Sequence, residues 1–274
     1  MDADRAVGWS AEAATAGAQG RLAGKVAVVT GGGTGIGRGV SEMLARHGAR
    51  VVLAGRRPGP LTATAAAIAA AGGAALAVPT DVTVAAQVEA MVARACAAWG
   101  GIDVLVSNAG VYPRRELADL SEEVWDLTID VNLKGHYLCV RNVVPAMLRR
   151  GGGSIIFIGS VHGYTGGADV LGYAAAKGGL WTMTRNLART FARQRIRVNY
   201  INPGWVASEG EVAHRQERGE SLAWLEEQGR TAVPSGRLQT PEDTAHVCLL
   251  LASDDATQIT ATRFNVDGGL SLVM

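Results

Sequence analysis

The 274-residue sequence has few cysteines, and their arrangement excludes several kinds of site. Cys96, Cys139 and Cys248 are far apart and odd in number, and none belongs to a Cys-x-x-Cys pair. This pattern predicts buried thiols in a reducing, cytoplasmic compartment rather than a disulfide framework. The five histidines are also scattered, without the spacing of metal ligands. We therefore expect no bound metal.

The sequence also lacks an excess of charge and a long apolar run. Its 26 basic and 25 acidic residues leave a net charge of +1, so we expect neither a nucleic-acid nor a membrane partner. No stretch reaches the roughly 18 apolar residues of a membrane span. Residues 1–21 mix acids with alanine and glycine and match neither a secretory signal nor a transit peptide. They predict a flexible tail, followed by one domain over residues 22–274.

Short apolar runs alternate with helical patterns throughout this domain. The expected strands are residues 25–30, 50–54, 74–79, 102–107, 153–159, 197–201 and 262–266, and the expected helices include 61–71, 84–99, 122–150, 171–193 and 242–252. Strands that are apolar on both faces indicate a parallel sheet covered by helices on both sides. The sequence therefore predicts a single-domain, doubly wound α/β fold of the Rossmann type, with seven parallel strands.

A glycine-rich turn joins the first strand to the first helix, in the pattern Thr30-Gly31-x-x-x-Gly35-x-Gly37. Glycines allow a sharp turn and a close approach to a diphosphate, and the following helix offers free N–H groups to the anion. The spacing differs from the common G-x-G-x-x-G. Its place between strand and helix nevertheless predicts a dinucleotide site.

The second strand ends without the acid that usually binds the ribose hydroxyl of NAD. Positions 53–57 carry no Asp or Glu, whereas Arg56 can pair with the 2′-phosphate of NADP. We therefore favour NADP(H), with NAD(H) as the alternative if Arg56 and Arg57 are only solvated side chains at the start of a loop.

The glycine turn, with four other motifs, resembles the short-chain dehydrogenase/reductase family in its single-domain form, from about Leu22 to the C-terminus. The other motifs, in family order, are Asn108-Ala109-Gly110, Asn132, Ser160 with Tyr173-x-x-x-Lys177, and Pro203-Gly204. The resemblance implies an oxidoreductase in which Asn132, Ser160, Tyr173 and Lys177 are catalytic. It also implies contacts with the cofactor from Gly31, Thr34, Gly35, Ile36, Gly37, Arg56, Asp81, Val82, Asn108, Gly110, Tyr173, Lys177, Pro203, Gly204, Val206 and Ser208.

The chemistry of these four catalytic residues, called the tetrad below (Asn132, Ser160, Tyr173 and Lys177), also follows from their residue types. Tyr173 and Lys177 lie four positions apart, hence on one face of a helix. A nearby ammonium lowers the pKa of a phenol, so Tyr173 can serve as general acid or base. Ser160 follows the fifth strand and can bind the reacting oxygen; no G-x-S-x-G elbow marks it as a nucleophile. Asn132 matches the family position for a water-mediated proton relay, or simply bonds to the backbone.

Substrate identity is open at the level of sequence. The expected substrate contacts are Ser160, His162, Tyr173 and Trp205, although His162 can equally be loop packing. Residues 203–240 predict a lid with one short helical piece around Leu222, and its glycines would allow movement. Arg114 and Arg115 can meet an acidic group or lie solvated. Long apolar helices, together with the resemblance, imply a homodimer or homotetramer.

The favoured function is an alcohol dehydrogenase or ketone reductase. An epimerase or dehydratase on the same fold is one alternative, but it usually has G-x-x-G-x-x-G and a larger C-terminal domain. A non-catalytic, cofactor-sensing or scaffold protein is the other. Such a protein has no use for the proton relay that the tetrad implies.

Overall fold

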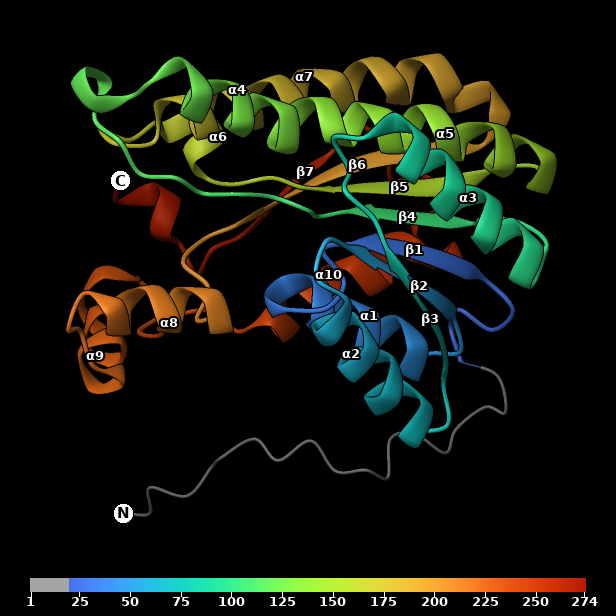
Figure 1. Cartoon of the computed structure of the whole chain (residues 1–274), viewed down its shortest axis with the longest axis horizontal. Coiled ribbons are helices and arrows are strands. Elements are labelled where there is room, and N and C mark those ends of the chain that lie inside the picture. The colour runs from blue at the N-terminus through green and yellow to red at the C-terminus, as the bar shows by residue number, and fades with distance from the viewer. Residues whose placement is uncertain (1–19) are drawn as a thin grey trace.

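The computed structural model describes residues 20–274, and Figure 1 shows a central sheet between two layers of helices. Seven strands form the sheet of this part of the chain, all parallel, in the order β3-β2-β1-β4-β5-β6-β7. They are β1 (Val26–Thr30), β2 (Arg50–Gly55), β3 (Ala74–Pro79), β4 (Val104–Ser107), β5 (Gly153–Ile158), β6 (Ile196–Pro203) and β7 (Arg263–Val266). The predicted doubly wound fold is confirmed, and its strand order reverses between β1 and β4.

Ten α-helices connect or flank these strands in the described residues. They are α1 (Gly35–Arg46), α2 (Pro58–Ala70), α3 (Ala85–Trp99), α4 (Glu122–Ile129), α5 (Gly135–Arg150), α6 (His162–Thr165), α7 (Leu171–Phe191), α8 (Glu209–Glu217), α9 (Leu222–Ala232) and α10 (Pro241–Ala252). One π-helical turn, η3 (Asp130–Lys134), joins α4 to α5. The expected tail, residues 1–21, lies outside the described residues apart from its last two.

Each face of the sheet has its own hydrophobic core. Val40 of α1, Ile68 of α2 and Leu249 of α10 pack on one face. Met91 of α3 and Leu180 of α7 belong to the core on the other face, which α5 also covers. Because helices cover both sides, all five residues of β1 are buried, which explains why all of them except Thr30 are apolar.

The segment after β6 contains two helices, where the sequence predicts one short helical piece. α8 and α9 lie side by side, apart from the sheet (Figure 1). Serine caps begin both, since Ser208 Oγ accepts from Glu211 N and Ser221 Oγ accepts from Trp224 N. Periodicity missed α8 because the helix is polar and buries no side chain completely.

Candidate active site

The glycine turn between β1 and α1 forms a cradle that leaves no room for side chains. Gly31 has φ +66°, and a Cβ atom there would lie 2.7 Å from Asn108 Nδ2. A Cβ atom on Gly37 would lie 2.1 Å from the carbonyl oxygen of Gly31. The helix that follows has no acidic side chain in its first turn, so its N-terminal N–H groups favour an anion. These residues fit the diphosphate of a dinucleotide.

Hydrogen bonds between β1 and β4 hold this cradle in place. Thr30 Oγ1 accepts from the backbone N–H groups of Asn108 and Ala109, at 2.9 and 3.0 Å. The side chain of Asn108 donates to the carbonyl oxygen of Thr30 at 2.9 Å. Asn108 is therefore anchored at the point where the strand order reverses, the usual place for a ligand in an open α/β sheet.

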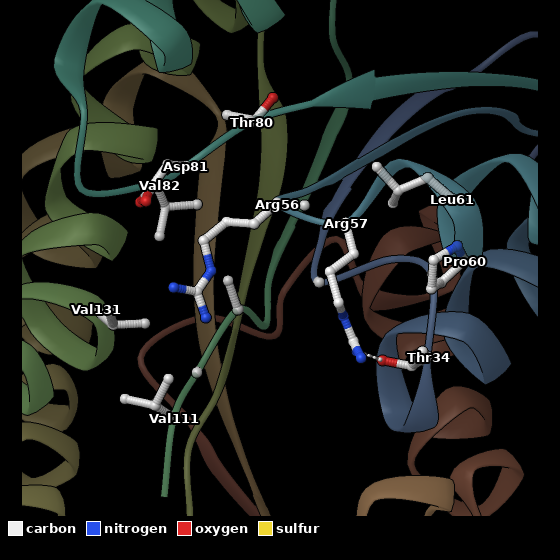
Figure 2. Close-up of a pocket in the computed structure, with 15 residues that line it drawn as sticks. Thr34, Arg56, Arg57, Pro60, Leu61, Thr80, Asp81, Val82, Val111 and Val131 are labelled. Atoms are coloured by element: carbon white, nitrogen blue, oxygen red, sulfur yellow. Dashed lines mark hydrogen bonds between the residues drawn. The ribbon is translucent and has the colours of Figure 1, made fainter.

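A cavity of about 150 Å³ opens beside the glycine turn, and two arginines reach it (Figure 2). Arg56 and Arg57 follow β2, and Arg57 Nη2 donates to Thr34 Oγ1 at 3.4 Å. Asp81 and Val82 line the same cavity from the end of β3. Thr83 donates to the Asp81 carboxylate and the charge of Arg56 stabilises it, so the pKa of Asp81 is lowered in spite of burial. The cavity therefore offers the positive charges of Arg56 and Arg57, which suit a 2′-phosphate.

A larger cavity of about 810 Å³ continues from the glycine turn to Tyr173. Both cavities are lined by Gly31, Thr34, Ala109, Gly110 and Val111. They therefore form one continuous groove along the carboxyl ends of the strands. The larger cavity brings together all four expected tetrad residues, and Ile36, Pro203, Gly204, Trp205, Val206 and Ser208 also line it.

The expected catalytic pair lies deep in this groove. Lys177 is only 3% exposed, and its Nζ donates to the carbonyl oxygen of Ile158 at 2.8 Å. The same Nζ lies 5.5 Å from the centre of the Tyr173 ring. Burial lowers the pKa of Lys177 to about 7.

The pKa of Tyr173 differs from the simple expectation for a Tyr–Lys pair. Burial raises it to about 12, although a hydrogen bond with the Ser160 side chain opposes this rise. The Lys177 ammonium, 5.5 Å from the ring centre, does not offset this effect of burial. The phenol of Tyr173 therefore stays protonated near neutral pH in this structure.

Asn132 lies in the π-helical turn η3 and is fully buried. Its Nδ2 donates to the carbonyl oxygens of Val111 and Thr128, both at 2.9 Å, and its Oδ1 accepts from Val111 N at 3.2 Å. The side chain therefore fixes the loop after β4. These bonds match the alternative in which Asn132 simply bonds to the backbone. The widened turn interrupts the regular helical bonding around Asn132, which is common at functional sites.

Tyr112, a pocket candidate of the sequence because it follows the Asn-Ala-Gly turn, lies against Tyr173. The ring of Tyr112 meets that of Tyr173 edge-on, with centroids 4.6 Å apart. Tyr112 Oη lies 3.2 Å from His162 Nε2, and His162 Nδ1 lies 2.6 Å from the carbonyl oxygen of Gly166. The bond to Gly166 requires a proton on Nδ1, so Tyr112 donates to Nε2. His162 thus holds Tyr112 beside the cavity.

A cluster of indoles and charges forms the lid side of the cavity. The guanidinium of Arg215 lies 5.2 Å from the ring of Trp205 and 5.4 Å from that of Trp224. Its Nε donates to Glu211 at 2.7 Å and its Nη1 to Glu220 at 3.1 Å. Arg215 is thereby fully paired, and it ties α8 to α9.

Several expected contacts have structural partners. Arg114 forms an ion pair with Asp169 at 2.7 Å, so it is not a free cation for an acidic substrate. Ser208 caps α8. The expected lid glycines Gly204 and Gly229 allow close packing, since a Cβ atom on Gly204 would lie 2.8 Å from Asp267 and one on Gly229 would lie 2.7 Å from a neighbouring backbone nitrogen.

Arg57, Gly33 and Thr80 also line the groove but were not among the expected contacts. Arg57 was visible in the sequence beside Arg56, yet only the fold shows that both reach the same cavity. Within residues 20–274, no helix is long and apolar enough to cross a membrane. The same residues bring together no group of three or more His, Cys, Asp or Glu side chains that could hold a metal.

Known proteins share this architecture over nearly the whole chain. A family model described as Enoyl-(Acyl carrier protein) reductase matches residues 31–271. An uncharacterised oxidoreductase of Thermotoga maritima is 37% identical, over 92% of this chain and 98% of its own length. A 3-oxoacyl-[acyl-carrier-protein] reductase, FabG, of the same organism is 34% identical over 91% of this chain and 99% of its own.

Solved structures of similar sequence have the same fold. A protein from Burkholderia xenovorans, assigned as a short-chain dehydrogenase/reductase, has a TM-score of 0.88 and 36% identity, covering 92% of this chain and 98% of its own. One from Beutenbergia cavernae, assigned as an NAD(P)-dependent gluconate 5-dehydrogenase and holding NADP, has a TM-score of 0.83 and 35% identity over the same shares. The chain belongs to the short-chain dehydrogenase/reductase family of oxidoreductases.

Proposed function

We propose that this oxidoreductase transfers a hydride between NADP(H) and the carbon of an alcohol or ketone. The observation that carries the proposal is the continuous groove, in which the glycine cradle at one end leads to Ser160, Tyr173 and Lys177 at the other. Two hydroxyl groups beside a lysine suit a reaction in which an oxygen gains or loses a proton while its carbon exchanges a hydride. The relative named as a 3-oxoacyl reductase supports a carbonyl substrate.

Tyr173 serves in this proposal as the general acid for reduction and the general base for oxidation. Its raised pKa of about 12 keeps the phenol protonated in the free protein, ready to donate to a carbonyl oxygen. Ser160 donates to the same oxygen and stabilises its developing charge. Lys177, which donates to Ile158 at 2.8 Å, would return the proton to Tyr173, and a water held at Asn132 would link Lys177 to solvent.

The nicotinamide supplies the hydride chemistry and, when oxidised, a positive charge that favours the Tyr173 phenolate. The side chains proposed to meet the substrate are Ser160, His162, Tyr173 and Trp205, with Tyr112 added by its contact with Tyr173. Arg114 and Arg215 are already paired with carboxylates and so offer no free positive charge. We therefore propose that the part of the substrate that reacts is uncharged.

NADP(H) is favoured over NAD(H) because Arg56 and Arg57 reach the cavity at the end of β2 and no acid stands beside them on that strand. The bound NADP of the Beutenbergia protein supports this choice by similarity. Asp81 lines the same cavity as Arg56, and its carboxylate accepts hydrogen bonds from the backbone N–H and the hydroxyl group of Thr83.

The test is a panel of alcohols and ketones followed at the nicotinamide absorbance with both cofactors. We expect turnover with a ketone or secondary alcohol and a lower KM for NADPH than for NADH. Arg56→Glu is expected to reverse the cofactor preference, because a carboxylate repels the 2′-phosphate. A preference for NADH in the unchanged protein overturns the NADP assignment. Absence of turnover across the panel favours the non-catalytic alternative.

A further inference from the structure

The N-terminus of α1 is occupied in this structure by a side chain from the lid. The backbone N–H of Gly35 donates to Glu209 Oε2 at 2.8 Å. Arg38 Nη1 donates to the other oxygen, Glu209 Oε1, at 2.7 Å. The carboxylate of Glu209 thus binds to the glycine turn from a position 174 residues further along the chain.

Local packing explains how Glu209 reaches this place. It is the first residue of α8, directly after the cap Ser208. Ser208 lies over the turn, since its Cβ would be 3.3 Å from a Cβ atom placed on Gly35. The first turn of α1 carries no acid of its own, so Glu209 supplies the negative charge that the helix dipole favours.

The N-terminus of α1, to which the Gly35 N–H group belongs, is where the proposed dinucleotide would place its diphosphate. A carboxylate and a diphosphate cannot share it, because both are anions that accept hydrogen bonds from the same donors. The Glu209 side chain is 53% exposed and that of Arg38 is 48% exposed. Exposed pairs contribute little to stability, so an incoming ligand can displace the carboxylate at low cost.

We infer that Glu209 is a further residue of the cofactor site, which occupies the diphosphate position in the free protein and gives way to the diphosphate when the cofactor binds. The inference rests on the proposed function in one respect, namely that a dinucleotide binds at this turn. Arg38, which also donates to Glu42 Oε1 at 2.9 Å, then pairs with the diphosphate instead of with Glu209. Cofactor binding then frees the start of α8, and with it the lid side of the substrate cavity.

The first test compares two ligands that undergo no redox reaction. ADP-ribose contains the diphosphate, whereas adenosine 2′-monophosphate can occupy only the Arg56 end. Glu209→Gln keeps the size of the side chain and removes its charge. We expect this variant to lower the Kd for ADP-ribose roughly three- to tenfold and to leave the Kd for adenosine 2′-monophosphate unchanged. Unchanged or weaker ADP-ribose binding overturns the inference.

Glu42→Gln is the matched control, because Glu42 is the other carboxylate on Arg38 but does not touch Gly35. We expect it to change the Kd for ADP-ribose by less than about twofold. An equal gain in both variants would show that the general field around Arg38 matters rather than occupation of the site, and would also overturn the inference.

The second test measures amide hydrogen exchange in residues 209–217. Saturating ADP-ribose is expected to speed exchange there in the unchanged protein, whereas in Glu209→Gln exchange is fast from the outset. Exchange unaffected by ADP-ribose contradicts displacement. If ADP-ribose does not bind at all, this inference and the proposed function both fail. If it binds as expected without turnover of any alcohol or ketone, only the proposed function fails.

Discussion

At the scale of single residues, burial decides the protonation of the expected catalytic pair. It raises the pKa of Tyr173 to about 12 and lowers that of Lys177 to about 7. Both shifts disfavour the charged forms, so the free site is close to neutral. The positive nicotinamide ring would then be the agent that activates Tyr173.

Replacing Tyr173 with Phe removes the hydroxyl group and keeps the ring. We expect kcat to fall roughly 10²- to 10⁴-fold, the contribution typical of a general acid–base group. The Kd for NADPH should change by less than about twofold, because the glycine cradle is untouched. Stopped-flow turnover and fluorescence titration measure the two quantities. Wild-type turnover in the variant would remove Tyr173 from the mechanism.

Burial of the Lys177 ammonium lowers the stability of the folded protein by an amount that depends on pH. Its pKa in the folded state is about 7, below the ordinary 10.5, so the unfolded state binds more protons between these values. The cost is complete below about pH 7 and disappears as the pH rises towards 10.5.

We therefore expect Lys177→Met to abolish turnover and to raise the free energy of unfolding at pH 7 by about 1–3 kcal/mol, after the lost bond to Ile158 is counted. The advantage should shrink as the pH rises above 7. Urea unfolding of both proteins at several pH values checks this. An advantage that is constant with pH contradicts burial of a titrating lysine.

At the scale of elements, the turn from β1 to α1 depends on close backbone contacts. A Cβ atom on Gly37 would lie 2.1 Å from the carbonyl oxygen of Gly31, so Gly37→Ala must shift the turn. We expect a loss of about 1–3 kcal/mol of stability and at least about tenfold weaker NADPH binding. Gly59→Ala in α2 is the control, since its Cβ would meet nothing within 4 Å. Equal behaviour of the two variants would disprove the cradle.

At the scale of the whole molecule, apolar side chains remain exposed along α4 and α5. Trp125 and Leu127 on α4 are 36% and 45% exposed, and Tyr137 and Leu148 on α5 are 47% and 42% exposed. Figure 1 shows both helices in the layer that also holds α7. Exposed apolar side chains on neighbouring helices are typical of an interface, and family resemblance implies a homodimer or homotetramer.

We expect light scattering to give a dimeric or tetrameric mass, and Tyr137→Glu with Leu148→Glu to lower it, because two charges would be buried in the interface. Leu117→Glu is the control, since Leu117 is 73% exposed and lies outside these helices. A monomer in the unchanged protein would contradict the expected assembly.

Sequence patterns predicted the regular elements and missed those whose signal is polar. Continuous apolar strands such as β1 are readable because burial on both faces requires them. The polar helix α8 was not readable, since its stability comes from the Ser208 cap and from contacts with α9. Tyr173, Lys177 and Ser160 could be proposed because they occur together with the glycine turn and Asn132 in the order of the family motifs, and all of them line one cavity.

The sequence by itself determined the doubly wound fold and the glycine turn, because hydrophobic periodicity and glycine positions act over a few residues. It also placed Tyr173 and Lys177 on one helix face. Only the tertiary structure decided that burial, rather than the lysine charge, sets the pKa of Tyr173. It alone brought Glu209 onto the N–H of Gly35, since a contact across 174 residues depends on how the lid packs and leaves no local pattern in the sequence.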